Sequence, residues 1–260
     1  MAAPAVLPNA PHRHGGTGGK VTEAPTPSSQ ASLTGLPQVI FVTGTDTGVG
    51  KTITTAALAT ALPGTVSVYK PAQTGVGDGE PGDADEVRRL SGAARVTEGI
   101  RLLEPMAPVA AAARQGAALP SLANHVRHIE QLAAESDHVL VEGAGGLLVE
   151  LDGEGRTLAD LAAAMGNSDV GGAGVVVVCR SGLGTLNHTL LTLEALETRN
   201  LAAAGLVIGS WPVEPSAVEE DNLRYLQSVD VPFLGAIPQD AAGLHPAKFQ
   251  ADARDWFRLL

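Results

Sequence analysis

The chain has 260 residues, of which 44% are hydrophobic and 17% charged, a composition typical of a globular protein that buries a substantial core. Its formal net charge of −11 at pH 7 and its aromatic content of 3% argue against binding to nucleic acid or to anionic lipid. An anionic ligand must therefore be held by local geometry, because the overall field repels it.

Residues 1 to 36 differ from the remainder of the chain, since they are rich in Pro, Gly, Ser and Thr and contain little that could be buried. We expect a disordered N-terminal extension there, followed by a single domain over residues 37–260. No apolar run reaches the roughly 20 residues of a membrane span, and the N-terminus does not resemble a secretory signal. The single cysteine, Cys179, cannot form an internal disulfide, and we expect a buried core thiol in a cytoplasmic protein.

From residue 39 onward, short apolar runs alternate with segments of helical periodicity. The runs QVIFVTG, TVSVYKP, HVLVEG, GAGVVVVC, AGLVIGS and VPFLGAIP have the Val and Ile content of strands that are covered on both faces. Helices are predicted for residues 51–62, 119–135, 158–165 and 185–199. This alternation predicts an α/β fold with a mostly parallel sheet that is flanked by helices on both faces.

The first predicted strand runs into a glycine-rich turn, GTDTGVGKT, which opens a predicted helix. Such a turn directs backbone N–H groups at a phosphate, while Lys51 reaches the terminal phosphates and the Thr52 hydroxyl can bind Mg²⁺. The spacing is unusual, because Thr45 stands where the first glycine normally lies and Gly44 comes one place earlier. A turn that binds nothing is the alternative, but the strand before it and the helix after it favour a P-loop NTPase type of site.

The second strand carries Lys70 near its end, with Thr74 shortly after it. The carboxyl ends of parallel strands form the ligand crevice of an open sheet. Lys70 could be a surface charge, but two lysines beside one polyphosphate would stabilise the charge of a phosphoryl-transfer transition state. The glycine-rich segment that follows contains several acids, and composition alone does not choose a ligand among them: Asp78, Glu80, Asp83, Asp85 and Glu86.

Further along, His125 and His128 lie three residues apart on a predicted helix, a spacing compatible with metal binding. No third ligand lies nearby in the sequence, so we interpret them as part of an exposed helix face. The strand HVLVEG then ends in Glu142, followed by GAGG. We expect Glu142 beside the phosphate loop, where Mg²⁺ on a nucleotide takes one or two carboxylates. An acid that caps an ordinary turn is the alternative. No G-x-S-x-G motif and no spacing typical of a catalytic triad is present.

Taken together, these segments resemble the dethiobiotin synthetases, the ATP-dependent ligases of biotin synthesis. The resemblance extends from about residue 38 to about residue 240 and includes VTGTDTGVGKT, YKPAQTG, GDADEV, MAP at 106–108, VEGAGGLLVEL, GLGTLNHTLLTLEAL and GLVIGSW.

The resemblance implies ATP and Mg²⁺ as cofactors. It implies that the nucleotide lies near Gly48, Val49, Gly50, Lys51, Thr52, Ile53, Asp83, Glu142, Gly143, Ala144, Gly145, Gly209, Ser210, Pro238, Gln239 and Asp240. The implied metal ligands are Thr52, Asp83 and Glu142, and the implied catalytic groups are Lys70 and Lys51. Thr74 would contact the substrate. The family forms homodimers, and Gly184, Thr185, Leu186 and Asn187 would offer backbone N–H groups to the substrate carboxylate across the interface.

The implied reaction begins with 7,8-diaminopelargonic acid, CO₂ (or bicarbonate) and MgATP. One amine takes up CO₂ as a carbamate, the carbamate oxygen attacks the γ-phosphate, and the second amine closes the ureido ring of dethiobiotin and expels phosphate.

Two other functions fit a P-loop chain of this kind. One is an amidating ligase of corrin synthesis, which would need a nucleophilic cysteine for its ammonia source, a role for which Cys179 in a buried strand is unsuited. The other is an ATP-gated switch of the chromosome-partition type. Such switches carry an additional lysine near the start of the loop, where this chain has Gly44, Thr45 and Asp46.

Overall fold

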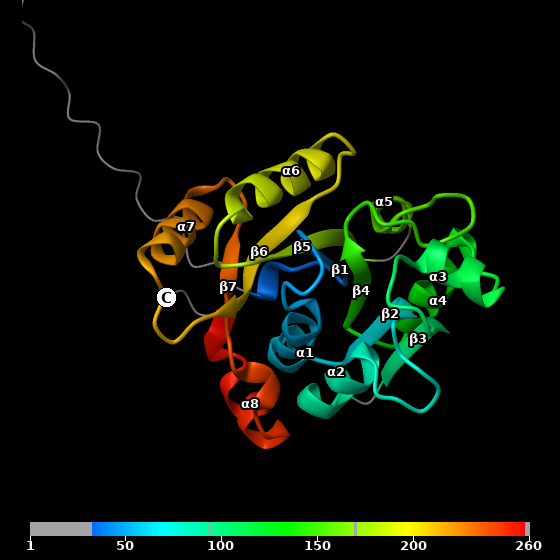
Figure 1. Cartoon of the computed structure of the whole chain (residues 1–260), viewed down its shortest axis with the longest axis horizontal. Helices are drawn as coiled ribbons and strands as arrows, with labels where there is room; N and C mark the ends of the chain where they lie inside the picture. Colours follow the sequence, from blue (N-terminus) through cyan, green and yellow to red (C-terminus); the bar gives the residue numbers. More distant parts are fainter. Residues whose placement is uncertain (1–32, 94, 169–170, 258–260) are drawn as a thin grey trace, which may run out of the picture.

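A parallel sheet forms the centre of the molecule, which we describe from a computed structural model over residues 33–93, 95–168 and 171–257 (Figure 1). Within these residues the sheet has seven strands, each parallel to its neighbours. Their spatial order is β3 (Arg95–Leu102), β2 (Val66–Thr74), β4 (His138–Gly146), β1 (Val39–Gly44), β5 (Ala173–Cys179), β6 (Ala203–Trp211) and β7 (Phe233–Pro238).

Helices cover both faces of this sheet (Figure 1). One face carries α1 (Lys51–Ala61), α2 (Asp83–Ser91) and α8 (Pro246–Asp252). The other carries α4 (Leu122–Ala133), α5 (Leu158–Gly166), α6 (Thr185–Glu197) and α7 (Ala217–Ser228). The remaining helix, α3 (Pro108–Gln115), packs at the β2–β3 edge through its own small apolar cluster. The predicted fold class, a parallel α/β sheet between two helical layers, is confirmed.

The core consists of two apolar clusters, one on each face of the sheet. Successive residues of a strand point to opposite faces, so Phe41 belongs to one cluster and Ile40 to the other, and both are fully buried. This two-sided burial explains why the central strands read as continuous apolar runs. Cys179 is a buried core thiol, as expected, and burial raises its pKa to about 11.

The six strands and four helices expected from the sequence are all present. The sequence analysis assigned no residue range to β3, α2, α3, α7 or α8. Strand β3, RVTEGIRL, lies at the edge of the sheet and pairs only with β2 in the described residues, so several of its side chains stay in contact with water. Its polar residues hide the apolar signal that identified the inner strands.

Two expectations about local structure are wrong. Lys70 and Glu142 do not mark the ends of their strands, because β2 continues to Thr74 and β4 to Gly146. His125 is not exposed either. It is only 1% exposed, and its Nδ1 atom lies 2.6 Å from the Tyr69 hydroxyl. His128 is partly buried, with its Nε2 atom 3.0 Å from the Thr97 hydroxyl.

The expected N-terminal extension lies outside the described residues up to residue 32. In its last part, Leu33–Gly35 form a short 3₁₀-helix, and the side chains of Leu33 and Leu36 pack against the core cluster beneath α1. No helix of the described residues is both long and apolar enough to span a bilayer.

Candidate functional site

The carboxyl ends of all the strands meet at one edge of the sheet, because the strands are parallel, and a cavity of about 400 Å³ opens there. Ten of the residues predicted from the sequence line it. These are Gly48, Gly50, Lys51, Thr52, Ile53, Lys70, Thr74, Asp83, Ala144 and Gly145. Residues that are far apart in the chain are thus gathered in the crevice that the strand pattern predicts.

The phosphate loop between β1 and α1 is wrapped so tightly that side chains are excluded at several points. A Cβ atom at Gly44 would lie 2.5 Å from the carbonyl oxygen of Asp46, so the early glycine is required by the path of the longer loop. Gly48 and Gly50 have φ angles of 67° and 95°, which L side chains rarely adopt. Residues of this loop and the N-terminus of α1 line the cavity, and a glycine-rich turn at a helix N-terminus is the kind of structure that binds anions.

Gly209 packs directly against this loop. A Cβ atom at Gly209 would lie 2.1 Å from the carbonyl oxygen of Val49, and one at Gly50 would lie 2.3 Å from the carbonyl oxygen of Gly209. The end of β6 therefore supports the phosphate loop by direct backbone contact. This is a structural reason for glycine at both positions that is independent of any nucleotide.

Lys51 lies at the start of α1 and donates a hydrogen bond from Nζ to the carbonyl oxygen of Asp46 at 3.2 Å. Burial lowers the pKa of Lys51, and the nearby positive charge of Lys70 lowers it further. Asp46 also forms an ion pair of 2.6 Å with Arg180, a residue that the sequence analysis did not identify. The loop is thus fixed from β5 as well as from β6.

Lys70 is the centre of the charged part of the site. It is 4% exposed, and its Nζ atom lies 2.6 Å from Asp83 Oδ2 and 2.8 Å from Glu142 Oε1. Burial by itself would lower the pKa of Lys70, but the two carboxylates raise it above its ordinary value. Burial likewise acts to raise the pKa of Asp83, and the charge of Lys70 outweighs it and lowers that pKa. Lys70 and Asp83 are therefore charged at neutral pH.

The oxygen atoms in this cluster fit Mg²⁺. The Thr52 hydroxyl donates to Glu142 Oε1 at 3.0 Å, and it lies near enough to the Asp83 carboxylate to help lower the pKa of Asp83. Glu142 Oε2 is buried without a hydrogen-bond partner among the described residues, which leaves an acceptor available. Hydroxyl and carboxylate oxygens are the ligands that Mg²⁺ prefers. The described residues contain no group of three His, Cys, Asp or Glu side chains that could hold a metal alone, so phosphate oxygens would have to complete the set.

A second cavity of about 380 Å³ adjoins the first and shares Thr47, Thr74, Ala144 and Gly145 with it. Its further walls come from Met106, which lies just before α3, and from Val149 in the segment after β4. The shared residues place a space for a small molecule beside the phosphate site. Thr74, at the end of β2, contacts both spaces, in agreement with its predicted position.

Neither cavity is lined by the predicted residues Val49, Glu142, Gly143, Gly209 and Ser210. Two further predicted segments also line neither cavity. At the start of α6, Gly184 has a φ angle of 86°, Thr185 is buried and Asn187 is exposed. At the end of β7, the residues Pro238–Asp240 are exposed, and the backbone N–H of Gln239 donates to the carbonyl oxygen of Trp211 at 2.8 Å. Within one chain, the structure thus brings together the residues predicted to bind phosphate and metal but not these two segments.

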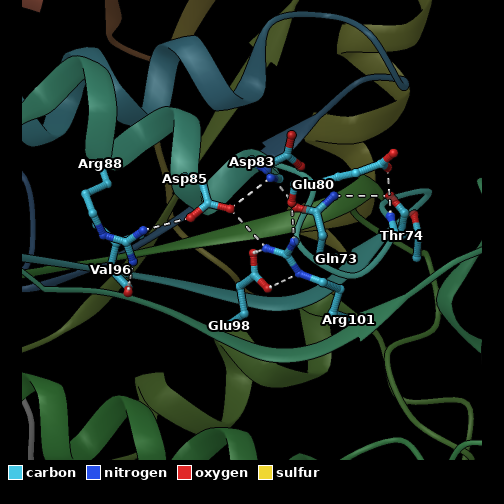
Figure 2. Close-up of polar contacts among 11 residues, drawn as sticks. Gln73, Thr74, Glu80, Asp83, Asp85, Arg88, Val96, Glu98 and Arg101 are labelled. Carbon is cyan, nitrogen blue, oxygen red and sulfur yellow. Dashed lines mark hydrogen bonds and ion pairs between the residues drawn. The ribbon is translucent and has the colours of Figure 1, made fainter.

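Gln73 is a residue of the site that the sequence analysis quoted within YKPAQTG without assigning it a role. It is 4% exposed and lines the first cavity. Figure 2 shows its side-chain amide between the end of β2 and the start of α2, in contact with Thr74 and Asp83. An uncharged amide gives no signal of function in a single sequence, and only the fold shows what it touches.

The fold and this site define a class of protein, the P-loop enzymes that bind a nucleoside triphosphate at the carboxyl edge of a parallel sheet. A family model with the description "AAA domain" matches residues 38–245. The chain is 50% identical over 223 residues to the ATP-dependent dethiobiotin synthetase BioD of Rhodococcus jostii, a match that covers 84% of this chain and 94% of that protein. It is 49% identical over 230 residues to the protein of the same name from Mycobacterium avium, covering 85% and 98%. The chain therefore belongs to the family of ATP-dependent dethiobiotin synthetases.

Solved structures with a similar arrangement are more distant. A ParA family ATPase from Chlorobium tepidum aligns with a TM-score of 0.49 and 15% identity over 83% of this chain and 90% of that one. The MinD cell division protein of Aquifex aeolicus aligns with a TM-score of 0.43 and 16% identity over 83% of this chain and 87% of that one. Likenesses of this degree say nothing about activity.

Proposed function

We propose that this protein is an ATP-dependent ligase that forms dethiobiotin from 7,8-diaminopelargonic acid and CO₂. The observation that carries the proposal is the position of Lys70. This buried lysine is held between Asp83 and Glu142 beside the phosphate loop, and a second cavity adjoins the same crevice. Such an arrangement suits the transfer of a phosphoryl group to a small molecule.

The proposed reaction has three steps. One amine of the diamine attacks CO₂ and gives a carbamate, with loss of a proton. A carbamate oxygen then attacks the γ-phosphorus of ATP, and the bond from this phosphorus to the β,γ-bridging oxygen breaks. ADP departs, and the product is a carbamic-phosphoric anhydride. The second amine attacks the carbonyl carbon of this anhydride, the ureido ring closes, and inorganic phosphate leaves. No protein nucleophile takes part, so positioning and electrostatic stabilisation do the catalytic work.

The residues of the first cavity divide this work. The backbone N–H groups of the loop from Gly48 to Thr52 bind the phosphates. Lys51 stabilises negative charge on the moving phosphoryl group. Lys70 lines the first cavity, which adjoins the second, and would stabilise the carbamate as well; its two carboxylate neighbours keep it protonated.

Mg²⁺ would be held by the Thr52 hydroxyl and the carboxylates of Asp83 and Glu142, together with phosphate oxygens. When bound, it supplies positive charge to the β- and γ-phosphates. The support for this assignment is the set of converging oxygen atoms, including the unpartnered Glu142 Oε2 within the described residues.

We propose further that the active form is a cytoplasmic homodimer in which the start of α6 serves the partner's site. Gly184, Thr185, Leu186 and Asn187 lie at a helix N-terminus, the end of a helix that attracts anions such as the substrate carboxylate. In their own chain they line neither cavity, which fits a role in the partner.

The base of ATP would lie near the ends of β6 and β7, at Ser210 and Pro238–Asp240. Their support is positional, since both strand ends lie on the same edge of the sheet as the phosphate loop. Gly209 would lie near the nucleotide as well, but its packing on Val49 and Gly50 already explains why this residue is glycine.

The test is direct. Purified protein is mixed with the diamine, bicarbonate, ATP and MgCl₂, and dethiobiotin, ADP and phosphate are measured by mass spectrometry and a coupled assay. We expect dethiobiotin and ADP in equal amounts, with ATP turnover that depends on the diamine. Absence of dethiobiotin from the folded wild-type protein would exclude the proposed activity.

The same assay distinguishes the proposed ligase from the two other functions that fit a P-loop chain. A switch of the chromosome-partition type hydrolyses ATP in response to a protein partner or DNA and does not need the diamine. An amidating ligase with its own ammonia source needs a reactive cysteine, whereas Cys179 is fully buried and its pKa is raised to about 11.

A further inference from the structure

The side chain of Gln73 joins two parts of the site that the chain supplies separately. Its Oε1 atom accepts a hydrogen bond of 2.8 Å from the backbone N–H of Asp83, the first residue of α2. Its Nε2 atom donates a hydrogen bond of 3.1 Å to the carbonyl oxygen of Thr74, the last residue of β2. One amide therefore connects the backbone of a proposed metal ligand with that of a proposed substrate-binding residue (Figure 2).

The first turn of a helix has backbone N–H groups without partners inside the helix. At the start of α2, two backbone N–H groups each have a different side chain as their hydrogen-bond acceptor. Gln73 binds the N–H of Asp83, and the Asp85 carboxylate accepts from the N–H of Gly82 at 2.9 Å. A Cβ atom at Gly82 would lie 2.9 Å from Gln73 Oε1, so the helix start approaches the amide as closely as glycine permits. Gln73 thus contacts the start of α2 directly, at the backbone of Asp83.

Strand β3 holds the same turn from the other side. The Arg101 guanidinium donates to the carbonyl oxygen of Glu80 and to Asp85 Oδ2, and Glu98 holds it in place with two hydrogen bonds (Figure 2). These contacts fix the loop and the outer side of the helix start. Among the described residues, Gln73 provides the one buried side chain that hydrogen-bonds the backbone of Asp83 itself.

We propose that Gln73 is a positioning residue for the metal site: its amide fixes the backbone of Asp83, so that the Asp83 carboxylate is held 2.6 Å from Lys70 and within reach of Thr52. The inference rests on the proposed function, because it takes Asp83 as a metal ligand. Groups that orient a ligand in this way typically change metal affinity about 10- to 100-fold when they are removed.

The alternative is that Gln73 is only a buried polar group with satisfied hydrogen bonds, whose loss costs stability and nothing else. Gln38 provides a matched control for this alternative. It directly precedes β1, at the amino ends of the strands and thus at the end of the sheet away from the site. There its amide makes hydrogen bonds with the backbone of Ala133, Ser136 and Gly171. Gln38→Met and Gln73→Met remove the same amide at a similar side-chain volume.

The experiment uses the full chain with Mn²⁺ as the probe and a non-hydrolysable ATP analogue, and binding is followed by electron paramagnetic resonance. We expect Gln73→Met to weaken Mn²⁺ binding at least about tenfold, and Gln38→Met to leave it unchanged. Asp83→Asn should weaken it as well, and adding Gln73→Met to Asp83→Asn should cause no further loss. A residue that acts through the Asp83 carboxylate has nothing left to position once that carboxylate is gone.

Gln73→Glu completes the set, because it keeps an acceptor for the Asp83 N–H and should retain more of the Mn²⁺ affinity than Gln73→Met. The inference is overturned if folded Gln73→Met binds Mn²⁺ like Gln38→Met, if its effect adds in full to that of Asp83→Asn, or if Gln73→Glu binds no better than Gln73→Met. These outcomes are independent of dethiobiotin formation, which is measured separately on the wild type. If Asp83→Asn alone leaves Mn²⁺ binding intact, the metal assignment under the proposed function fails.

Discussion

At the scale of single residues, the site depends on a buried lysine that compensates two carboxylates. Glu142 is 1% exposed and Lys70 4%, so neither group is well solvated, and the two form an ion pair in which each compensates the charge of the other. Breaking such a pair is costly, because the remaining charge is left buried without a partner. Lys70 therefore has a structural role in the free protein and a proposed catalytic role in the same position.

This double role gives a prediction for Lys70→Met. Dethiobiotin formation should fall at least about 100-fold, the loss that follows removal of a group that stabilises transition-state charge. Without divalent cations the variant should also melt at a lower temperature, because Asp83 and Glu142 then repel each other. MgCl₂ should restore much of that stability, since the cation compensates the same carboxylates. Thermal unfolding with and without MgCl₂ checks this.

The matched control is Lys248→Met on α8, which removes a lysine whose ion pair with Asp252 lies largely in solvent. Its melting temperature should change little and should not respond to MgCl₂ differently from wild type. If Lys70→Met keeps wild-type turnover, the catalytic role is wrong. If MgCl₂ does not raise its melting temperature, the two carboxylates do not form the proposed metal site.

The site residues differ in how far the sequence could predict them. Lys70 and Glu142 follow from their place on apolar runs that all point to one crevice, and the structure brings them within 2.8 Å of each other. Asp83 did not follow from the residues alone, because several acids lie in the same segment and resemblance was needed to choose it. What selects Asp83 physically is the exact start of α2, which depends on Gln73 and on the missed strand β3.

At the scale of elements, β3 and α4 show why polar residues mislead a single-sequence prediction. Arg101 and Glu98 look like surface charges, but they hold the start of α2. His125 looks like part of an exposed helix face, yet α4 turns it against Tyr69 on β2. The periodicity of a helix shows that one face is buried, but contacts made by the rest of the fold decide which polar side chains that face includes.

The buried histidine predicts a pH dependence of stability. Burial lowers the pKa of His125 below its ordinary value of 6.5, the charge of Asp152 opposes this shift, and His128 adds to it. The unfolded chain therefore binds more protons than the folded chain just below pH 6.5. The free energy of unfolding should then fall as the pH is lowered through this window. Chemical denaturation at several pH values between about 7 and about 5 measures it.

His125→Asn removes this titration and keeps a polar atom near the Tyr69 hydroxyl. We expect lower stability at neutral pH but a smaller further loss on acidification than in wild type. His245→Asn is the control, because His245 is exposed and caps α8, a position that asparagine also suits. A wild-type slope in His125→Asn would show that other groups cause the acid sensitivity.

At the scale of the whole molecule, the outer side of α6 and the segment after β4 carry large apolar side chains in solvent. Leu183 is 80% exposed, Leu191 55% and Leu148 48%. Leu148 and Leu191 line one common hollow of about 240 Å³. Apolar groups gathered in this way are typical of an interaction surface. Leu183 directly precedes Gly184, so the surface borders the helix start that we propose to serve the partner's site.

A homodimer through this surface makes a prediction for Leu191→Lys. A charge placed in an apolar interface is left desolvated and repelled by its copy, so the dimer should dissociate. Analytical ultracentrifugation should show wild type at twice the mass of one chain and the variant near one. Because the substrate carboxylate is proposed to bind the partner's α6, the KM for the diamine should rise much more than the KM for ATP.

Leu103→Lys, which replaces a leucine of similar exposure beyond the end of β3, should remain dimeric. A monomeric wild type with full activity would exclude both the interface and the shared site, because the phosphate loop, Lys70 and both cavities would then suffice within one chain.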